Sequence, residues 1–363
     1  MSDESSEEEL SGEELENEGE GEEKGEEEEE EKGEEEEQEV DIVQQKLDSK
    51  PKHPVPEEEN ALTKLKAGQC LRMLGRTGNV IEHAYLKIEA TNMGLTDISI
   101  IAKFRFLEFV DVSNNHLKTQ ALHCLSNLKN LVMIIADGNI IDSLEIPLMP
   151  FLQVLSLSDN EIQSTSGLKQ PIIESLNLNN NLIKVIEGLE PAELQEIRNL
   201  EFRGNALTTT SGISFATLRS LYLADNLINK LEGLEALVNL QRLHLRGNRL
   251  SRLDGFSNSM EKLKYLNLRN NKIENLLELK KLSTLSALEI VVVLENPFAA
   301  DAEEDYRVEV LVYLPKLKRI DKELVQEEEL EEADERRAER EEELGGEEEA
   351  NEDMGEGDED DDD

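Results

Sequence analysis

The sequence predicts a repeat solenoid of the α/β class, with short parallel strands on one face and acidic tails at both ends. Three observations predict this fold. Asparagine recurs at nearly constant spacing through the middle of the chain, each copy stands in the same apolar frame, and acidic residues concentrate outside the repeated region. A sequence period of roughly 20 to 50 residues is typical of solenoids, propellers and arrays.

Nine asparagines define the period. They are separated by 21 to 25 residues and stand at Asn115, Asn139, Asn160, Asn181, Asn205, Asn226, Asn248, Asn271 and Asn296. Around each of them lies the frame L-x-x-L-x-L-x-x-N-x-L, as in Leu152, Leu155, Leu157, Asn160 and Ile162. This frame is the leucine-rich repeat.

Each part of the frame has a physical role. The Leu-x-Leu segment is a short strand whose two leucines point inward, while the residue between them faces outward. The asparagine follows the strand, where its side chain can satisfy backbone groups of the turn. A single repeat cannot bury its own leucines, so neighbouring repeats must stack. The sequence therefore predicts an α/β leucine-rich repeat solenoid, a horseshoe with a parallel sheet on its concave face.

The two ends of such a stack have to be covered. The repeats are predicted over 85–298, as one degenerate copy without the asparagine and nine regular copies. Residues 57–74 have the apolar spacing of an amphipathic helix, which predicts an N-terminal helical cap over 55–84. A C-terminal cap is predicted over 299–325, where Tyr306, Leu314 and Ile320 follow the last repeat.

The net charge of −45 lies almost entirely at the two ends of the 363-residue chain. Residues 1–40 hold 23 acidic and 2 basic residues, and residues 321–363 hold 25 and 4. Segments with so many like charges and so few apolar residues cannot offset the entropy lost on ordering. We expect disordered acidic tails over 1–50 and 345–363, and a charged exposed helix over 326–344. The tails serve either solubility and spacing or, at that helix, a partner or coiled-coil contact.

The composition also excludes classes of function. Tails of this charge repel nucleic acid phosphates and anionic membranes, so neither is an expected partner. No apolar run is long enough to span a bilayer, and the acidic start of the chain does not resemble a signal peptide. With only 2 cysteines the chain has no disulfide framework. We expect a soluble intracellular protein with reduced thiols.

The sequence carries no recognisable active-site motif. The five histidines form no H-E-x-x-H motif and no zinc-ligand spacing with cysteine. Neither Cys70 nor Cys124 stands in a catalytic context, and neither a P-loop nor a G-x-S-x-G motif occurs. We expect no enzyme activity, no metal, no cofactor and no small-molecule substrate. The remaining function is the binding of other proteins.

The outward positions of the frame predict where partners bind. These positions are apolar in the first repeats, and in later repeats they gather arginine and aromatic residues, the types enriched at interface hot spots. Adjacent strands lie about 4.8 Å apart, so these side chains form continuous patches. The alternatives are a plain solvated face or a contact with the chain's own acidic tail. The predicted partner-binding residues are Phe109, Met133, Ile135, Arg203, Tyr222, Arg242, His244, Arg246, Tyr265 and Arg269.

Particular segments resemble one family of leucine-rich repeat proteins. The stretch RTGNVIEHAYLKIE at 76–89, followed by GLTDI at 94–98, resembles the segment that leads into the repeats of a ciliary family. LYLADN at 221–226 and LHLRGN at 243–248 resemble it as well. The resemblance implies a radial spoke component of motile cilia and sperm flagella. The implied role is a cytoskeletal scaffold of the axoneme that binds radial spoke head proteins and supports motility.

Two other families are alternatives. An acidic leucine-rich repeat chaperone that binds histones also joins such repeats to an acidic tail, but here acid flanks both ends and a basic cluster for nuclear import is not evident. A leucine-rich repeat regulatory subunit of a phosphatase would hold an enzyme on its concave face. The long tails of this chain weigh mildly against that reading.

Overall fold

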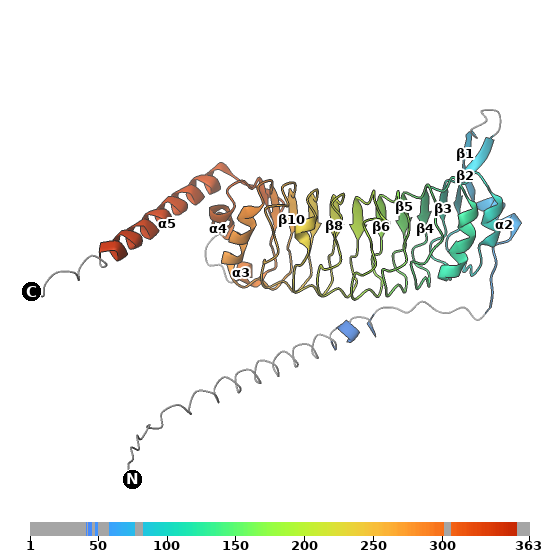
Figure 1. Cartoon of the computed structure of the whole chain (residues 1–363), viewed down its shortest axis with the longest axis horizontal. Coiled ribbons are helices and arrows are strands. Elements are labelled where there is room, and N and C mark those ends of the chain that lie inside the picture. Colours follow the sequence, from blue (N-terminus) through green and yellow to red (C-terminus); the bar gives the residue numbers. More distant parts are fainter. Residues whose placement is uncertain are drawn as a thin grey trace, which may run out of the picture. The chain divides into compact units, whose positions relative to one another are not determined.

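The computed structural model describes residues 41, 43–45, 48–49, 58–76, 83–300 and 306–353 (Figure 1). The chain divides into two units, Met1–Pro51 and Lys52–Asp363, and the fold is that of the second unit. In the first unit, residues 41, 43–45 and 48 are helical, which the prediction of a disordered tail over 1–50 did not include. The rest of that tail, and residues 354–363 of the C-terminal tail, lie outside the described residues.

A single sheet of 13 strands runs through the second unit, with the strands in sequence order. Strands β2 to β12 pair in parallel, while β1 and β13 pair antiparallel at the two ends. This arrangement confirms the predicted leucine-rich repeat solenoid. The strands are β1 (Leu71–Arg76), β2 (His83–Glu89), β3 (Phe109–Asp111), β4 (Met133–Ile135), β5 (Val154–Ser156), β6 (Ser175–Asn177), β7 (Asn199–Glu201), β8 (Ser220–Tyr222), β9 (Arg242–His244), β10 (Tyr265–Asn267), β11 (Ile290–Val292), β12 (Arg319–Ile320) and β13 (Glu323–Leu324).

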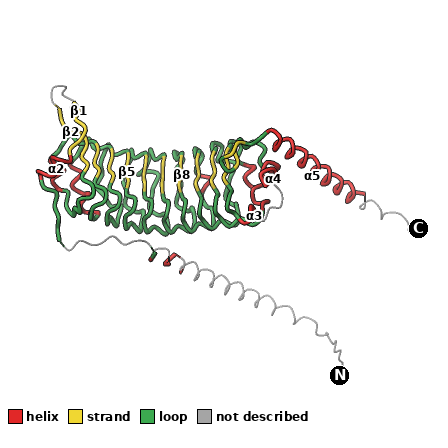
Figure 2. Tube along the Cα trace, turned by 180° about the vertical axis from the view of Figure 1, so that it is seen from behind, coloured by secondary structure: helices red, strands yellow, loops and turns green. Residues whose placement is uncertain are grey.

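Helical segments are short within the repeats and longer at the ends. Figure 2 shows the strands side by side along one side of the stack, with loops and short turns behind them. The 3₁₀ segments are η1 (Ser99–Lys103), η2 (Thr119–Asn127), η3 (Leu234–Ala236) and η4 (Leu276–Thr284). The described α-helices of the second unit are α2 (Lys64–Cys70), α3 (Pro297–Ala300), α4 (Tyr306–Tyr313) and α5 (Glu327–Asp353).

The core forms because the central residue of each strand points inward. Leu221 pairs between Leu200 and Leu243, and all three are fully buried. Burying one leucine side chain is worth about 1.5–3 kcal/mol, and this contribution recurs in every repeat. The resulting apolar core is continuous from the helix before the sheet to the helix after it.

The recurrence of asparagine in the frame is explained by one set of contacts, which Asn226 illustrates. Its Oδ1 accepts from the N–H of Leu207 at 3.1 Å, and its Nδ2 donates to the carbonyls of Phe202 at 2.8 Å and Leu223 at 3.0 Å. The residue before each of the nine asparagines has a φ between 54° and 70°. Glycine, asparagine and aspartate fill eight of these left-handed positions, because these residue types adopt that conformation at least cost.

The N-terminal cap differs from the prediction. Helix α2 begins after Thr63, whose Oγ1 accepts from the N–H of Lys66, but it ends at Cys70. From Leu71 the chain forms β1, which pairs antiparallel with β2, so the prediction of a helix to residue 74 was wrong. A Cβ at Gly75 would lie 2.3 Å from the side chain of Leu86, so a larger residue there would require Leu86 to shift. The hydrogen bonds between β1 and β2 therefore determine the conformation of these residues, although their apolar side chains have helical spacing.

The C-terminal end also differs. Helix α5 continues past Gly345-Gly346 to Asp353. The prediction that the helix ends at 344 was therefore wrong, and so was the prediction of disorder for residues 345–353. The helix is also not simply exposed, because Ala333 is buried against the core. Arg307 donates from Nε to Glu329 at 2.5 Å, and Arg340 donates to Glu309 at 2.8 Å. Ion pairs between α4 and the first half of α5 thus tie this helix to the solenoid.

Candidate protein-interaction surface

The exposed face of the sheet carries two rows of side chains, one on each side of the buried central row. The register places Phe109, Met133 and Val154 side by side across β3, β4 and β5. In the second row Ile135 pairs between Asp111 and Ser156. We call the four half-buried side chains Phe109, Met133, Ile135 and Val154 the apolar patch. The structure therefore brings together the three apolar residues predicted from the sequence.

The later strands bring together the predicted aromatic residues. The rings of Tyr222 and His244 stack with their centroids 4.6 Å apart, and Tyr265 lies 4.8 Å from His244 on the other side. Because Tyr222, His244 and Tyr265 come from β8, β9 and β10, the stack crosses three repeats. Aromatic pairs of this geometry add about 0.5–1.5 kcal/mol beyond their burial. The stack is therefore a preformed, rigid surface.

A pocket of about 300 Å³ opens beside this stack on the same face. Four of the predicted residues line it, and Arg242 and Tyr265 follow in the neighbouring row. We call this the arginine–aromatic surface. The pocket is lined by Asn179, Glu201, Arg203, Tyr222, Ala224, Asp225, His244, Arg246 and Asn267. The acidic lining residues Glu201 and Asp225 were not predicted, although both stand at or near outward positions of the frame.

The arginines of this surface are not equivalent. Arg203 pairs with Asp225 at 2.8 Å, and Arg269 pairs with Glu295. The hydrogen bond from Arg269 holds the pKa of Glu295 below its usual value. Among the residues that the structure describes, Arg242 and Arg246 have no acidic side chain within salt-bridge distance, and both are exposed. On this surface, these two side chains are the cations most available to a partner.

His244 contributes a ring rather than a charge. Its burial, and secondarily the neighbouring Arg242, lower its pKa below the ordinary 6.5. The imidazole is therefore neutral at pH 7, which suits its place between two tyrosine rings.

A hydrogen-bonded polar strip lies between the apolar patch and the ring stack, and its last members, Asn179 and Glu201, also line the pocket. Ser156 donates to Asp137 at 2.7 Å, and Asn177 donates to Ser156 at 3.0 Å. Asn179 continues the strip by donating to Glu201 at 2.8 Å. Burial raises the pKa of Asp137, although the bonds from Ser156 and Ser158 oppose that rise. These side chains satisfy one another and form a fixed polar surface between the apolar and the arginine-rich parts.

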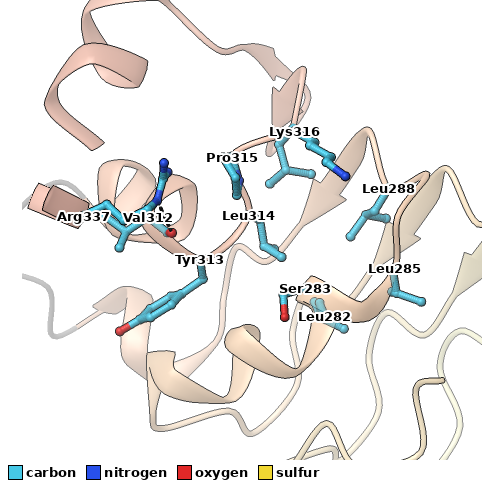
Figure 3. Close-up of a pocket in the computed structure, with 11 residues that line it drawn as sticks. Leu282, Ser283, Leu285, Leu288, Val312, Tyr313, Leu314, Pro315, Lys316 and Arg337 are labelled. Carbon is cyan, nitrogen blue, oxygen red and sulfur yellow. Dashed lines mark hydrogen bonds between the residues drawn. The ribbon is translucent and has the colours of Figure 1, made fainter. Parts of the chain in front are cut away.

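A second pocket lies at the C-terminal end, in the part of the chain shown in Figure 3. It has a volume of about 310 Å³ and is mostly lined by apolar side chains. Leu282 and Leu285 come from η4 and the residue after it, Leu314 follows α4, and Arg337 comes from α5. This pocket could not be predicted from the sequence, because three separate segments have to meet to form it.

The described part of the chain has four histidines and two free cysteines. No group of three or more His, Cys, Asp or Glu side chains there is placed to hold a metal ion. Burial, with a smaller effect of Asp97, raises the pKa of the Cys124 thiol to about 11, so this thiol stays protonated at pH 7. No helix within the described residues is long and apolar enough to cross a bilayer.

Comparison with known proteins places the chain among leucine-rich repeat proteins. Residues 196–347 match the leucine-rich repeat family. The chain is 44% identical over 274 residues to leucine-rich repeat-containing protein 23 of Bos taurus, covering 76% of this chain and 79% of that protein. It is 36% identical over 94 residues to cilia- and flagella-associated protein 410 of Homo sapiens, covering 26% of this chain and 36% of that protein.

A solved structure supports the fold alone. The crystal structure of a TLR13–ssRNA13 complex is similar with a TM-score of 0.53 and 23% identity, over 65% of this chain and 36% of that chain. The role of a scaffold for protein interactions is supported by the relatives and by the repeat family.

Proposed function

This chain belongs to the leucine-rich repeat-containing protein 23 family, and from that premise we propose that it is a non-catalytic scaffold of the axonemal radial spoke. In this role it binds radial spoke head proteins in cilia and sperm flagella and supports their motility. The observation that carries the proposal is the arginine–aromatic surface, where a ring stack lies beside two exposed arginines, Arg242 and Arg246.

The chemistry of this surface favours a protein partner. Tyrosine and arginine dominate interface hot spots because they bury a large area and also form directed hydrogen bonds. The neutral His244 ring keeps the stack intact when it is desolvated. Arg242 and Arg246 then present two guanidinium groups to acidic side chains of the partner.

The ciliary setting is supported from two sides. The segments at 76–89 and 94–98 resemble a family of radial spoke proteins. A shorter part of the chain is similar to a protein named for its association with cilia and flagella. A histone-binding chaperone and a phosphatase regulatory subunit are the alternatives that an experiment must separate.

Capture of partners by the full-length chain tests the proposal. The immobilised chain is incubated with detergent- and salt-extracted axonemal proteins, and bound proteins are identified by mass spectrometry. We expect radial spoke head proteins to be enriched. The double variant Arg242→Glu/Arg246→Glu should reduce that capture about tenfold, because a lost hot spot costs about 1–2 kcal/mol or more.

A matched control keeps the net charge equal. Lys169→Glu/Lys184→Glu changes the charge by the same amount at exposed positions on the return segments of the repeats, and capture should not change. Arg269 is left intact, since a glutamate there would face Glu295 and perturb the fold. Equal capture by the Arg242/Arg246 variant and the wild type would remove the arginine–aromatic surface from the proposal. Enrichment of histones or of a phosphatase instead would favour one of the alternatives.

A further inference from the structure

The N-terminal end of the sheet exposes large apolar side chains that belong neither to the apolar patch nor to the arginine–aromatic surface. Leu74 on β1 pairs across the hairpin with Tyr85 on β2, and these side chains are 61% and 47% exposed. Phe106, just before β3, is 42% exposed. Soluble proteins usually scatter exposed apolar residues singly, so apolar residues gathered around one depression suggest a binding surface.

Tyr85 and Phe106 line a groove at this end of the sheet. It has a volume of about 240 Å³, and its lining is Ala84, Tyr85, Lys103, Phe104, Arg105 and Phe106. We call it the hairpin groove. Sites for drug-sized molecules usually measure about 300–1,000 Å³. The hairpin groove is smaller and open, which suits one apolar side chain projecting from a peptide.

The charge of this end is opposite to that of the whole chain. Between Asn60 and Phe106 the sequence has seven lysines and arginines and three acidic residues, while the whole chain carries −45. Within the described residues, Lys103 and Arg105 have no acidic partner at salt-bridge distance, and both are exposed. Two unpaired cations therefore flank an aromatic groove.

The hairpin itself directs how a partner would bind. Strand β1 is the edge strand at the N-terminal end of the sheet and pairs only with β2 among the described strands. Met73 has a φ of 52°, which interrupts the regular edge that an added strand would need. Side-chain insertion into the groove is therefore favoured over extension of the sheet.

We propose that the hairpin groove binds an acidic peptide segment of a protein partner, with one aromatic or aliphatic side chain inserted between Tyr85 and Phe106. Acidic residues beside that anchor pair with Lys103 and Arg105. A long polyanion is disfavoured by the net negative charge of the chain, whose repulsion acts mainly within the Debye length of about 8–10 Å. This inference does not depend on the ciliary assignment, and its test uses purified components only.

Fluorescence anisotropy on the full chain tests the proposal. The probe is a short fluorescein-labelled peptide of glutamates around a central Leu-Phe pair, and the comparison probe has Gly-Gly in place of Leu-Phe. We expect the Leu-Phe probe to bind at least about tenfold more tightly. Lys103→Glu/Arg105→Glu should weaken binding of both probes about tenfold or more, while Phe106→Ser should weaken only the Leu-Phe probe.

Control variants and a control ligand decide between explanations. Lys169→Glu/Lys184→Glu carries the same change of net charge and should keep affinity within about twofold.

No measurable binding of the Leu-Phe probe, or equal binding of the two probes, would overturn the proposal. A loss caused by Arg242→Glu/Arg246→Glu instead would assign the peptide to the arginine–aromatic surface. Oligothymidylate that binds as tightly as the Leu-Phe probe would show a general anion surface and also overturn it. Thermal melts confirm that each variant is folded.

Discussion

At the scale of the residue, the asparagine of each repeat satisfies backbone groups that belong to two neighbouring repeats. Asn248 accepts from the N–H of Ile228 and donates to the carbonyls of Leu223 and Leu245, and it is almost fully buried. A buried backbone group without a partner costs about 1–3 kcal/mol. The asparagines therefore stabilise the stacking as well as the turn.

Replacing Asn226 with alanine tests this account. The change leaves the N–H of Leu207 and the carbonyl of Phe202 without their side-chain partner. We expect the free energy of unfolding to fall by at least about 2 kcal/mol, measured by urea denaturation. Asn270→Gly is the control, because Asn270 is exposed and has a φ of 54° that glycine adopts freely. A variant Asn226→Ala as stable as Asn270→Gly would contradict the role of the ladder.

At the scale of the element, α5 is attached to the solenoid by charges. The hydrogen bond from Arg307 lowers the pKa of Glu329, with burial opposing it. Partial burial would raise the pKa of Glu309, but the hydrogen bonds from Arg340 and Arg336 outweigh it and leave that pKa below the usual 4.5. A carboxylate with a depressed pKa stabilises the fold above its unfolded pKa. That stability is lost as the pH falls through the folded pKa.

Acidification should therefore release α5. Amide hydrogen exchange, corrected for intrinsic rates, should show protection of residues 327–340 at pH 7 and its loss as the pH falls below about 4.5. At pH 7, Arg307→Ala should cause a similar loss, because it removes a charged hydrogen bond worth about 1.5–3 kcal/mol. Glu332→Gln is the control, since it removes only an exposed i,i+4 pair with Arg336. Protection that persists in Arg307→Ala would show that the Arg307–Glu329 pair is not needed to hold the helix.

The elements also show how far the sequence leads. The strands and the asparagine turns follow from a frame repeated nine times, and the apolar and aromatic side chains meet because parallel pairing keeps that frame in register. The hairpin at 71–89 was missed because its helical apolar spacing gave no sign of pairing with the first repeat. The docking of α5 was missed because Glu309 and Arg340 stand far apart in sequence. The C-terminal pocket and the hairpin groove were missed for the same reason, because each is lined by segments that are separated in the sequence.

At the scale of the whole molecule, the solenoid presents different surfaces at different strands of one sheet. The hairpin groove lies at β2 and the arginine–aromatic surface at β7 to β10, with β3 to β6 between them. At about 4.8 Å per strand, the two surfaces are roughly 20–25 Å apart. This separation allows two partners to bind at once, which is what a scaffold requires.

Fractionation of ciliated cells or sperm tests the central claim, that this chain is a structural component of the axoneme. The membrane is removed with detergent, the axonemes are extracted with rising salt and then chaotrope, and this chain is blotted together with radial spoke head proteins. The account predicts that the chain stays in the axoneme until strong extraction and leaves it together with those proteins. Release into the detergent-soluble or nuclear fraction would contradict the account and favour a regulatory subunit or a histone chaperone.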